Sequence, residues 1–262
     1  MSVFPPGLEP LDEVGAAAWA QEALAAWPDG RFRIRDLVPP VFEAYARILH
    51  GTGRAEGNVS TGTWGELAAA HGVDLGQETS FAELSGLPPE SREWDGAVPM
   101  EGSLTESEVT ALRRALERHT ATPERCLFLL WAGYGFLSEG GGGVLYEERS
   151  PRDELRDRRE ARAAERRAMR FARRFAKIEL LGRSGRTYFL LSGPVSAAER
   201  FTFGEHSFQS PNVWWPDDRA WLVHTEIDYH STYVGGSRGL VEELLASDLE
   251  CLEVQATSFA GG

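Results

Sequence analysis

The sequence predicts an α+β fold: a single mixed domain over residues 1–262, with a central antiparallel or mixed sheet, flanking helices and one long arginine-rich helix. Three observations predict it. Segments with the two-residue period of a strand and segments with the helical period follow one another irregularly, which disfavours a regular βαβ arrangement. One segment, ERCLFLLWAGYGFL, is almost wholly apolar and is expected in the centre of the core. A stretch rich in Ala, Arg and Glu has no breaker after its first proline.

The first third of the chain is expected to form three helices and one strand. Apolar residues at helical spacing define the helices, and the alternation of arginines with Phe32 and Ile34 defines the strand. Turn-forming Pro and Gly residues separate these segments. The expected helices are residues 12–26, 41–50 and 63–71, and the expected strand is residues 31–37.

The rest of the chain is expected to contribute two helices, three strands and a charged insertion. Ser103, with Glu106 three residues later, matches a capping box and predicts a helix to about His119. Ser150 and Pro151 suit the start of the long helical insertion, residues 150–178. The other expected helix is residues 237–247, and the expected strands are residues 187–192, 221–230 and 249–256.

Residues 221–230 alternate strictly along the predicted strand. Because side chains of a strand point to opposite faces in turn, the face with Trp221, Val223, Ile227 and Tyr229 should be core. The other face carries four ionisable groups. Two tryptophans precede the strand, in a segment that we interpret as a loop and tight turn. The candidate ligand-binding residues are Trp214, Trp215, Arg219, His224, Glu226, Asp228 and His230.

This polar face has several interpretations. The two histidines would lie ~20 Å apart, so the four groups cannot bind one ion. Glu226 and Asp228 could share a cation or divide acid and base roles. The face could equally be the solvated side of an antiparallel strand. We expect a basic residue of this chain, such as Arg183 or Arg186, to approach the carboxylates and make them mainly structural.

The adjacent tryptophans also leave two readings open. Neighbouring residues of an extended backbone cannot both point inward, so the two rings could pack into different layers of the core. Alternatively, one ring could form the rim of a cleft, where tryptophan is favoured in binding. No catalytic residue and no metal ligand is assigned from the sequence.

Charge is unevenly distributed along the chain. The net charge of −13 argues against a general affinity for nucleic acid. Residues 152–177 hold eleven Arg or Lys and five Asp or Glu, a local charge of +6, which leaves −19 elsewhere. This insertion could be a solvated helix that folds back on the acidic body, a protein-binding arm, or, least favoured, a contact for nucleic acid. The candidate partner-binding residues are Arg159, Arg162, Arg166, Arg170 and Arg173.

Composition and motifs limit the function classes. Hydrophobic residues make up 42% and charged residues 26%, which is ordinary for a soluble globular protein. No apolar run approaches the ~20 residues of a membrane span, and the N-terminus has no secretory signal. Cys126 and Cys251 fit buried thiols in a reducing cytoplasm. The common phosphate-loop, dinucleotide, hydrolase-elbow and zinc motifs are missing, so no cofactor is expected. The oligomeric state stays open.

Three phrases resemble a group of uncharacterised actinobacterial proteins: LVPPVFEAYARILH, RCLFLLWAGYGFL and SPNVWWPDDRAWLVHTEIDYHSTYVGGS. They span most of the chain, and the resemblance implies no function. A weaker similarity is to the SUKH immunity domains. TPERCLFLLWAGYGF with its Gly-rich turn is similar to their Pro-acidic, apolar-helix element, and SRGLVEELLASDLE resembles their closing helix. That resemblance implies an acidic α+β binding protein without a catalytic site.

Two functions are therefore expected. The first is a non-enzymatic protein that binds another macromolecule, with an immunity-type protein as one form. The alternative is a small-ligand-binding protein or a hydrolase-type enzyme, with a carboxylate site at Glu226 and Asp228 beside Trp214 and Trp215. The burial of the carboxylates should distinguish them, because a concave, half-buried pair favours the alternative and a flat, exposed pair favours the first function.

Overall fold

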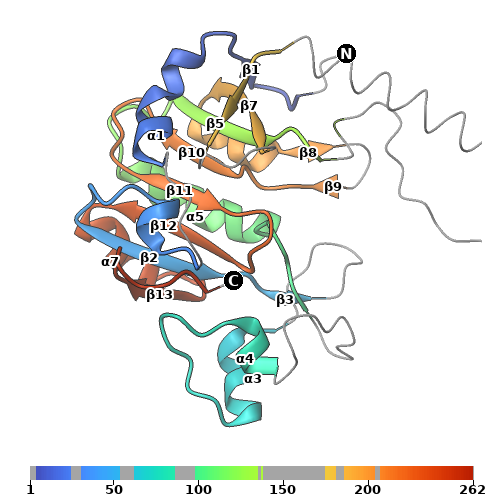
Figure 1. The fold of residues 1–262 in the computed structure, drawn as a ribbon, viewed down its shortest axis with the longest axis vertical. Coiled ribbons are helices and arrows are strands. Elements are labelled where there is room, and N and C mark those ends of the chain that lie inside the picture. Colours follow the sequence, from blue (N-terminus) through green and yellow to red (C-terminus); the bar gives the residue numbers. More distant parts are fainter. Residues whose placement is uncertain are drawn as a thin grey trace, which may run out of the picture.

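The computed structural model describes residues 4–24, 31–53, 62–85, 98–134, 137, 175–180, 186–203 and 207–261. At its centre lies a nine-stranded antiparallel sheet in the order β1-β7-β5-β10-β11-β12-β2-β13, with β6 also pairing β7 (Figure 1). The predicted α+β class with a central antiparallel sheet is confirmed. The strands are β1 (Glu9–Pro10), β2 (Ala44–Leu49), β5 (Cys126–Trp131), β6 (Lys177–Glu179), β7 (Thr187–Gly193), β10 (Val213–Pro216), β11 (Leu222–Thr225), β12 (Ser231–Gly236) and β13 (Cys251–Val254).

Outside this sheet lie two pairs of short strands, β3 (Thr52–Gly53) with β4 (Val98–Pro99), and β8 (Thr202–Phe203) with β9 (Ser207–Phe208).

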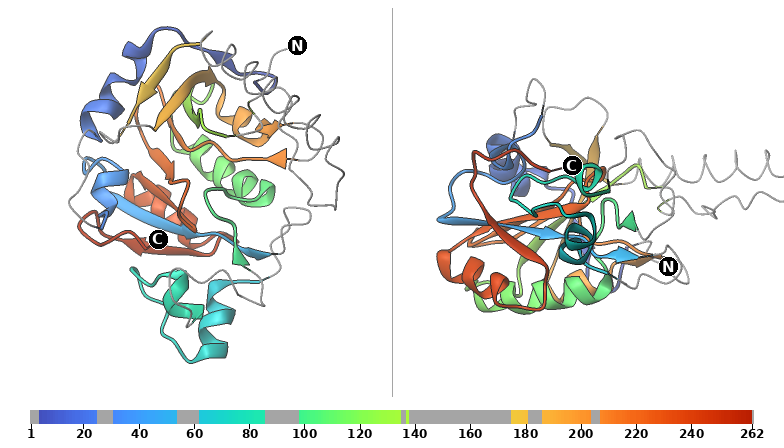
Figure 2. Two further views of the ribbon diagram at one scale, coloured as in Figure 1. Left: turned by 45° about the vertical axis from the view of Figure 1, so that its right-hand side comes forward. Right: turned by 90° about the horizontal axis from the view of Figure 1, so that it is seen from below.

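Helices cover both faces of the central sheet. One face packs against helices α5 and α7 and the 3-10 helix η3, and the other against α1 and α2 (Figure 2). The helical segments are η1 (Val14–Ala17), α1 (Ala18–Ala23), α2 (Ile34–Leu37), α3 (Trp64–His71), α4 (Phe81–Ser85), α5 (Glu106–Arg118), η3 (Val195–Arg200) and α7 (Arg238–Leu245).

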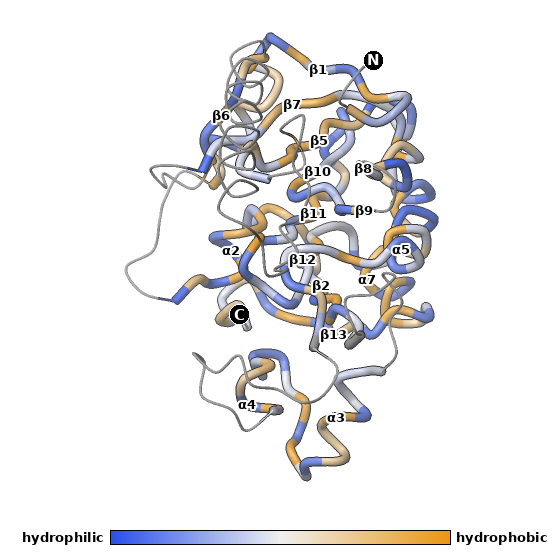
Figure 3. The backbone as a smooth tube through the Cα atoms, turned by 90° about the vertical axis from the view of Figure 1, so that its right-hand side faces the viewer, coloured by the Kyte–Doolittle hydropathy of each residue, from blue (hydrophilic) through white to orange (hydrophobic). Residues whose placement is uncertain are grey.

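The sheet is buried on both faces because each face has its own apolar layer. Strands β5 and β7 are drawn largely in the colours of hydrophobic residues in Figure 3. Phe128 of β5 packs in the layer beneath α5 and α7, whereas its neighbour Leu129 packs in the layer beneath α1 and α2. Burial of apolar surface at roughly 25 cal/mol per Å² makes such a three-layer core the main source of stability.

A small helical module extends one end of the sheet. Trp64 and Phe81, from α3 and α4, form a separate apolar cluster with Leu49 of β2. Helix α3 begins at a capping box in which the Thr63 hydroxyl accepts from the Glu66 amide. The Glu250 carboxylate also accepts hydrogen bonds from two backbone amides of the first turn, at 2.7 and 2.6 Å. A carboxylate at a helix N-terminus is stabilised by the helix dipole, so the segment before β13 holds the module in place.

The prediction of a helix at residues 41–50 is wrong. These residues form β2, which pairs with β12 on one side and β13 on the other. Every residue of β2 is buried. A strand that is buried on both faces has an almost continuous apolar run, which periodicity alone does not separate from a buried helix.

The strand expected at residues 31–37 is a short helix instead. The Arg33 amide donates to the Asp36 carboxylate at 2.7 Å and caps α2. The amides of Ile34 and Arg35 bond to carbonyl groups of the C-terminal segment after β13. Ile34 and Leu37, three residues apart, both point into the core. Phe32 precedes this helix and is also buried, so the alternation of Phe32 with Ile34 does not mark a strand.

The helix predicted from Ser103 begins two residues later. Thr105 is the N-cap of α5, and Glu108 completes the capping box. The Ser103 hydroxyl is instead within 3.3 Å of the Ser210 hydroxyl. The sequence contains two overlapping capping patterns, Ser103 with Glu106 and Thr105 with Glu108. The helix uses the second pattern, because Ser103 is buried. Helix α7 and strand β13 lie within their predicted ranges, and β7 extends one residue beyond its predicted range, to Gly193.

The strand predicted over residues 221–230 ends at Thr225. The chain turns at Glu226, whose carbonyl oxygen accepts from the Tyr229 amide at 3.0 Å, and β12 begins at Ser231. Trp221 and Val223 are core as predicted, whereas Ile227 and Tyr229 are half-buried in the turn. Gly235 and Gly236 are the last two residues of β12.

The arginine-rich insertion is mostly outside the described residues. The predicted helix of residues 150–178 cannot be compared with the structure before residue 175. Its last predicted residues, from Lys177, belong to strand β6, which pairs antiparallel with β7. Phe175 contacts Phe4 edge to face, with the ring centroids 5.2 Å apart. In the described part of the chain, no helix is long and apolar enough to cross a membrane.

Candidate functional site

The two adjacent tryptophans lie on β10 and point to opposite faces of the sheet. Trp214 stacks on Phe128 at 5.8 Å between ring centroids and contacts Trp221 edge to face. Trp215 contacts Trp19 of α1 in the other layer. Each is only 1% exposed. The interpretation of this segment as a loop is therefore wrong, and neither ring lines a cleft beside the carboxylates.

Arg219 lies at the opposite end of β11 from Glu226. It follows the end of β10 in an exposed turn and has a φ of 56°. Its guanidinium carbon is 5.2 Å from the centre of the Trp19 ring. Arg219 therefore belongs to a different surface from the carboxylates with which it was grouped.

His224 is a buried residue of β11. Its Nδ1 lies 2.6 Å from the Leu37 carbonyl oxygen. Because a carbonyl oxygen can only accept a hydrogen bond, the proton of a neutral ring is on Nδ1. Its Nε2 faces the Glu226 carboxylate at 3.7 Å. The pKa of His224 is lowered to about 4, chiefly by burial and to a smaller extent by the charge of Arg186, and the hydrogen bond to Leu37 opposes this shift. At neutral pH the ring is uncharged and anchors α2 to the sheet.

Glu226 and Asp228 share one cation, Arg186. This arginine directly precedes β7, and its guanidinium forms an ion pair with each carboxylate. The Glu226 side chain is 2% exposed and that of Asp228 is 59% exposed. The expectation that a basic residue of this chain approaches the carboxylates is confirmed. We call Arg186, His224, Glu226 and Asp228 the Arg186 cluster.

His230 lies apart from this cluster. Its ring is 5.6 Å from that of Phe81, in the small helical module. Burial lowers its pKa, and the charge of Arg47 adds to the effect. The four ionisable residues of the predicted polar face are therefore divided between two environments, because the strand that was to align them ends at Thr225.

Asn212 and Tyr134 adjoin the cluster and were not singled out in the sequence. The Asn212 side chain accepts from the Trp131 amide at 2.8 Å and donates to the Tyr134 hydroxyl at 2.9 Å. Burial raises the pKa of Tyr134, and Asp228 is among the groups that raise it further. This amide joins the end of β5 to the start of β10. A single Asn between a proline and two tryptophans gives no signal of this role.

Arg47 is the other buried charge that the sequence did not reveal. It lies in the centre of β2 and is 0% exposed. Its guanidinium donates to the Ser231 hydroxyl and to three backbone carbonyls, those of Gln77, Thr79 and Gly261, at 2.8 to 3.3 Å. Burial lowers its pKa. The interactions of Arg47 join three segments to β2.

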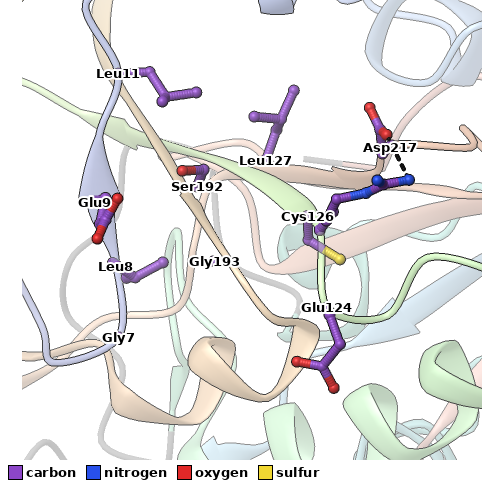
Figure 4. Close-up of a pocket in the computed structure, with 11 residues that line it drawn as sticks. Gly7, Leu8, Glu9, Leu11, Glu124, Cys126, Leu127, Ser192, Gly193 and Asp217 are labelled. Atoms are coloured by element: carbon purple, nitrogen blue, oxygen red, sulfur yellow. Dashed lines mark ion pairs between the residues drawn. The ribbon is translucent and has the colours of Figure 1, made fainter.

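A shallow hollow of about 620 Å³ lies at the far end of β5 and β7 from the Arg186 cluster (Figure 4). Its lining includes the buried Cys126, with Glu124 nearby, and Asp217, which pairs with Arg125 at 3.1 Å. The pKa of the Cys126 thiol is raised to about 12, chiefly by burial and to a smaller extent by the nearby carboxylates of Asp218, Glu124 and Asp217. Since the thiolate is the nucleophile, Cys126 is inert at neutral pH.

The remaining predicted residues have no described position. Arg159, Arg162, Arg166, Arg170 and Arg173 lie outside the described ranges. Within those ranges, no group of three His, Cys, Asp or Glu side chains is arranged to hold a metal ion. Compared with family models, with curated proteins and with solved structures, the chain matches none.

Proposed function

We propose that the chain is a non-enzymatic, cytoplasmic protein that binds another macromolecule, a protein rather than nucleic acid, and that an immunity-type role is one form of this function. The observation that carries the proposal is the double ion pair of Arg186. The carboxylates that suggested a catalytic or ligand-binding site are compensated by a cation of the same chain. Such a pair needs no external cation and has a structural explanation.

The geometry of the surrounding residues supports the same reading. An acid–base pair needs a cleft in which a substrate can reach both groups. Glu226 is buried behind Arg186, and His224 has its Nδ1 committed to the backbone. Of the four residues, only Asp228 has a largely exposed side chain that an external molecule could approach directly. The five arginines of the insertion remain candidate contacts for the partner.

The test begins with capture of a binding partner from the native host. The captured protein is purified, and its dissociation constant for the chain is measured by calorimetry. The variant with Glu226→Gln and Asp228→Asn is then compared with wild type. We expect the free energy of unfolding to fall by about 1–3 kcal/mol, because Arg186 keeps its charge without a carboxylate. The dissociation constant should not change.

A matched control removes two charges from α7 and the segment after it. Glu242→Gln with Asp248→Asn changes exposed residues and should leave the stability within about 0.5 kcal/mol of wild type. A double variant of the Arg186 cluster that is as stable as wild type but loses an activity or a ligand would favour the enzyme or small-ligand reading. Failure of every captured protein to bind the purified chain would also reject the proposal.

A further inference from the structure

The small helical module of α3 and α4 meets the sheet at a histidine and a buried arginine. Phe81 of α4 lies against the ring of His230, with the ring centroids 5.6 Å apart. Arg47 of β2 donates to the carbonyl oxygens of Gln77 and Thr79, which belong to the loop between the two helices. Figure 1 shows α3 and α4 below β13, beyond the layers that cover the sheet.

The surroundings of His230 suit only its neutral form. Its Nδ1 atom is buried and has no hydrogen-bond partner in the described part of the chain. A neutral ring carries one hydrogen and can hold it on Nε2, whereas an imidazolium carries a hydrogen on both nitrogens. Protonation would therefore place an N–H group on Nδ1 without an acceptor, and a buried donor without a partner is costly.

Arg47 makes a charged His230 less favourable still. Within the described residues Arg47 forms no ion pair, because its hydrogen bonds go to the Ser231 hydroxyl and to backbone carbonyl oxygens. No adjacent carboxylate therefore neutralises its charge. Burial lowers the pKa of His230, and the charge of Arg47 lowers it to a smaller extent. An imidazolium at this contact would be repelled by the guanidinium.

Other titratable groups lie around this contact. Burial lowers the pKa of His50 to about 3, but its ring is bonded to the sheet and to the segment after β4 rather than to the module. Glu250 accepts from two amides of α3, and burial raises its pKa, so proton uptake by Glu250 opposes that by His230. Asp228, in the turn of His230, pairs with Arg186. The module itself carries four exposed carboxylates: Glu66, Asp74, Glu78 and Glu83.

The module has an apolar cluster of its own. Trp64, Phe81 and Leu84 pack with Leu49 of β2 in a cluster that is separate from the two layers on the faces of the sheet. A small unit of this kind can open at a lower free energy than the whole domain. The contact therefore joins a histidine that resists protonation to a unit that can move away from it.

We propose that this contact is an acid-sensitive switch, in which proton uptake by His230 releases α3 and α4 while the sheet stays folded. Release gives the imidazolium access to water and uncovers the rings of Trp64 and Phe81. A released histidine has a pKa of about 6.5. Because the docked ring has a lower pKa, the docked state loses stability as pH falls below this value. The proposal goes beyond the binding function proposed above and does not depend on it.

The test is hydrogen exchange of the whole chain between about pH 7 and 5, with each amide rate divided by the rate of an unstructured peptide at the same pH. The opening constant of the amides of α3 and α4 should rise by up to about tenfold for each pH unit below 6.5. The amides of β5 and β7 should respond less. In His230→Asn, and separately in His230→Phe, the rise in α3 and α4 should be several-fold smaller, because neither side chain titrates.

His71→Asn is the matched control, because it removes an exposed histidine of the same module and should leave the wild-type response unchanged. The pKa of His230 is also read directly from its ring-proton shifts in NMR spectra, and a value at or above 6.5 would overturn the proposal. An equal rise in wild type and in the His230 variants would overturn it too. So would a module that is already open at neutral pH in both variants, or sheet amides that open together with α3 and α4.

Discussion

Arg186 and Glu226 meet where β7 begins and β11 ends, in an ion pair whose side chains are only 14% and 2% exposed. The same guanidinium extends to Asp228, so one cation links a buried carboxylate with a surface carboxylate. Removing an ion from water is costly unless it is paired. The burial of Glu226 therefore depends on Arg186.

Replacing Arg186 by leucine should lower the free energy of unfolding by about 3–5 kcal/mol, because Glu226 keeps its buried charge without the arginine. Adding Glu226→Leu should recover much of the loss, since an apolar pair has no ion to desolvate. Urea denaturation measures both. Arg238→Leu, which removes a half-exposed pair with Glu253, is the control and should cost less than about 1 kcal/mol. A loss in the Arg186 variant no larger than this would contradict the prediction.

His224 should make the protein sensitive to acid. Its pKa is about 4 in the folded chain, chiefly because it is buried, and about 6.5 in an unfolded chain. As pH falls, the unfolded state therefore takes up the proton first. The contribution of His224 is complete above pH 6.5 and is lost between 6.5 and 4, at up to about 1.4 kcal/mol per pH unit. His50, whose pKa burial lowers to about 3, acts in the same direction.

The variant His224→Asn tests this pH dependence. An asparagine amide can replace the Nδ1 donor to Leu37 but does not titrate. Between pH 6.5 and 4.5 its unfolding free energy should fall less steeply than that of wild type in urea titrations. His71→Asn changes an exposed histidine at the end of α3 and is the control. Parallel slopes for wild type and His224→Asn would show that His224 has the same pKa in the folded and unfolded chains.

Gly235 should tolerate no side chain. A Cβ there would lie 2.4 Å from Phe42 Cδ2 and 2.6 Å from Val38 Cγ1. Gly235→Ala should destabilise the fold by about 1–3 kcal/mol by displacing the loop that carries Val41. Gly15→Ala, where nothing lies within 4 Å, is the control. Thermal unfolding compares the two, and equal midpoints would mean that the loop moves freely.

Arg47 should hold the small helical module against the sheet. Arg47→Met removes the donor to the carbonyls of Gln77 and Thr79, and we expect a loss of about 2–4 kcal/mol. Arg47→Lys keeps the charge but cannot satisfy several carbonyls at fixed angles, so it should fall between Met and wild type. Hydrogen exchange should quicken first in α3 and α4. Uniform acceleration over the whole sheet would argue against a local role.

Two substitutions at Arg219 should separate backbone strain from side-chain contact. Arg219→Ala and Arg219→Gly both remove the contact with Trp19, but only glycine adopts a φ of 56° readily. The glycine variant should therefore be more stable than the alanine variant by about 1 kcal/mol. Chemical denaturation provides the comparison. Equal stabilities would show that the turn relaxes when the arginine is lost.

The sequence predicted the elements whose pattern is local and amphipathic. The capping residues of α3 and the apolar positions of α7 are sufficient by themselves to predict these two helices, because one face of each helix is solvated. Strand β2 was taken for a helix because it is buried on both sides, so its pattern reflects the packing of distant segments rather than its own period. Tertiary contacts of this kind are not visible in a single window.

The candidate site could be predicted only in part, because it too depends on contacts between segments that are distant in the sequence. The need for a cation beside Glu226 follows from the cost of a buried carboxylate, and Arg186 was one of the residues considered. The separation of His230 from the other three ionisable residues could not be foreseen, because it depends on the turn that ends β11. Arg47 was hidden in an apolar segment, and only the fold brings its carbonyl partners together.

The order of strands has a consequence for synthesis of the chain. Strand β2 is made early, but both of its neighbours, β12 and β13, come from the last part of the sequence. During synthesis, the almost continuous apolar segment of β2 therefore stays uncovered until most of the chain has left the ribosome. Such distant pairings slow folding and leave strand edges open to association with other chains. The end of the sheet formed by β12, β2 and β13 is thus its last part to close, and the newly made chain is most vulnerable to aggregation before β12 and β13 appear.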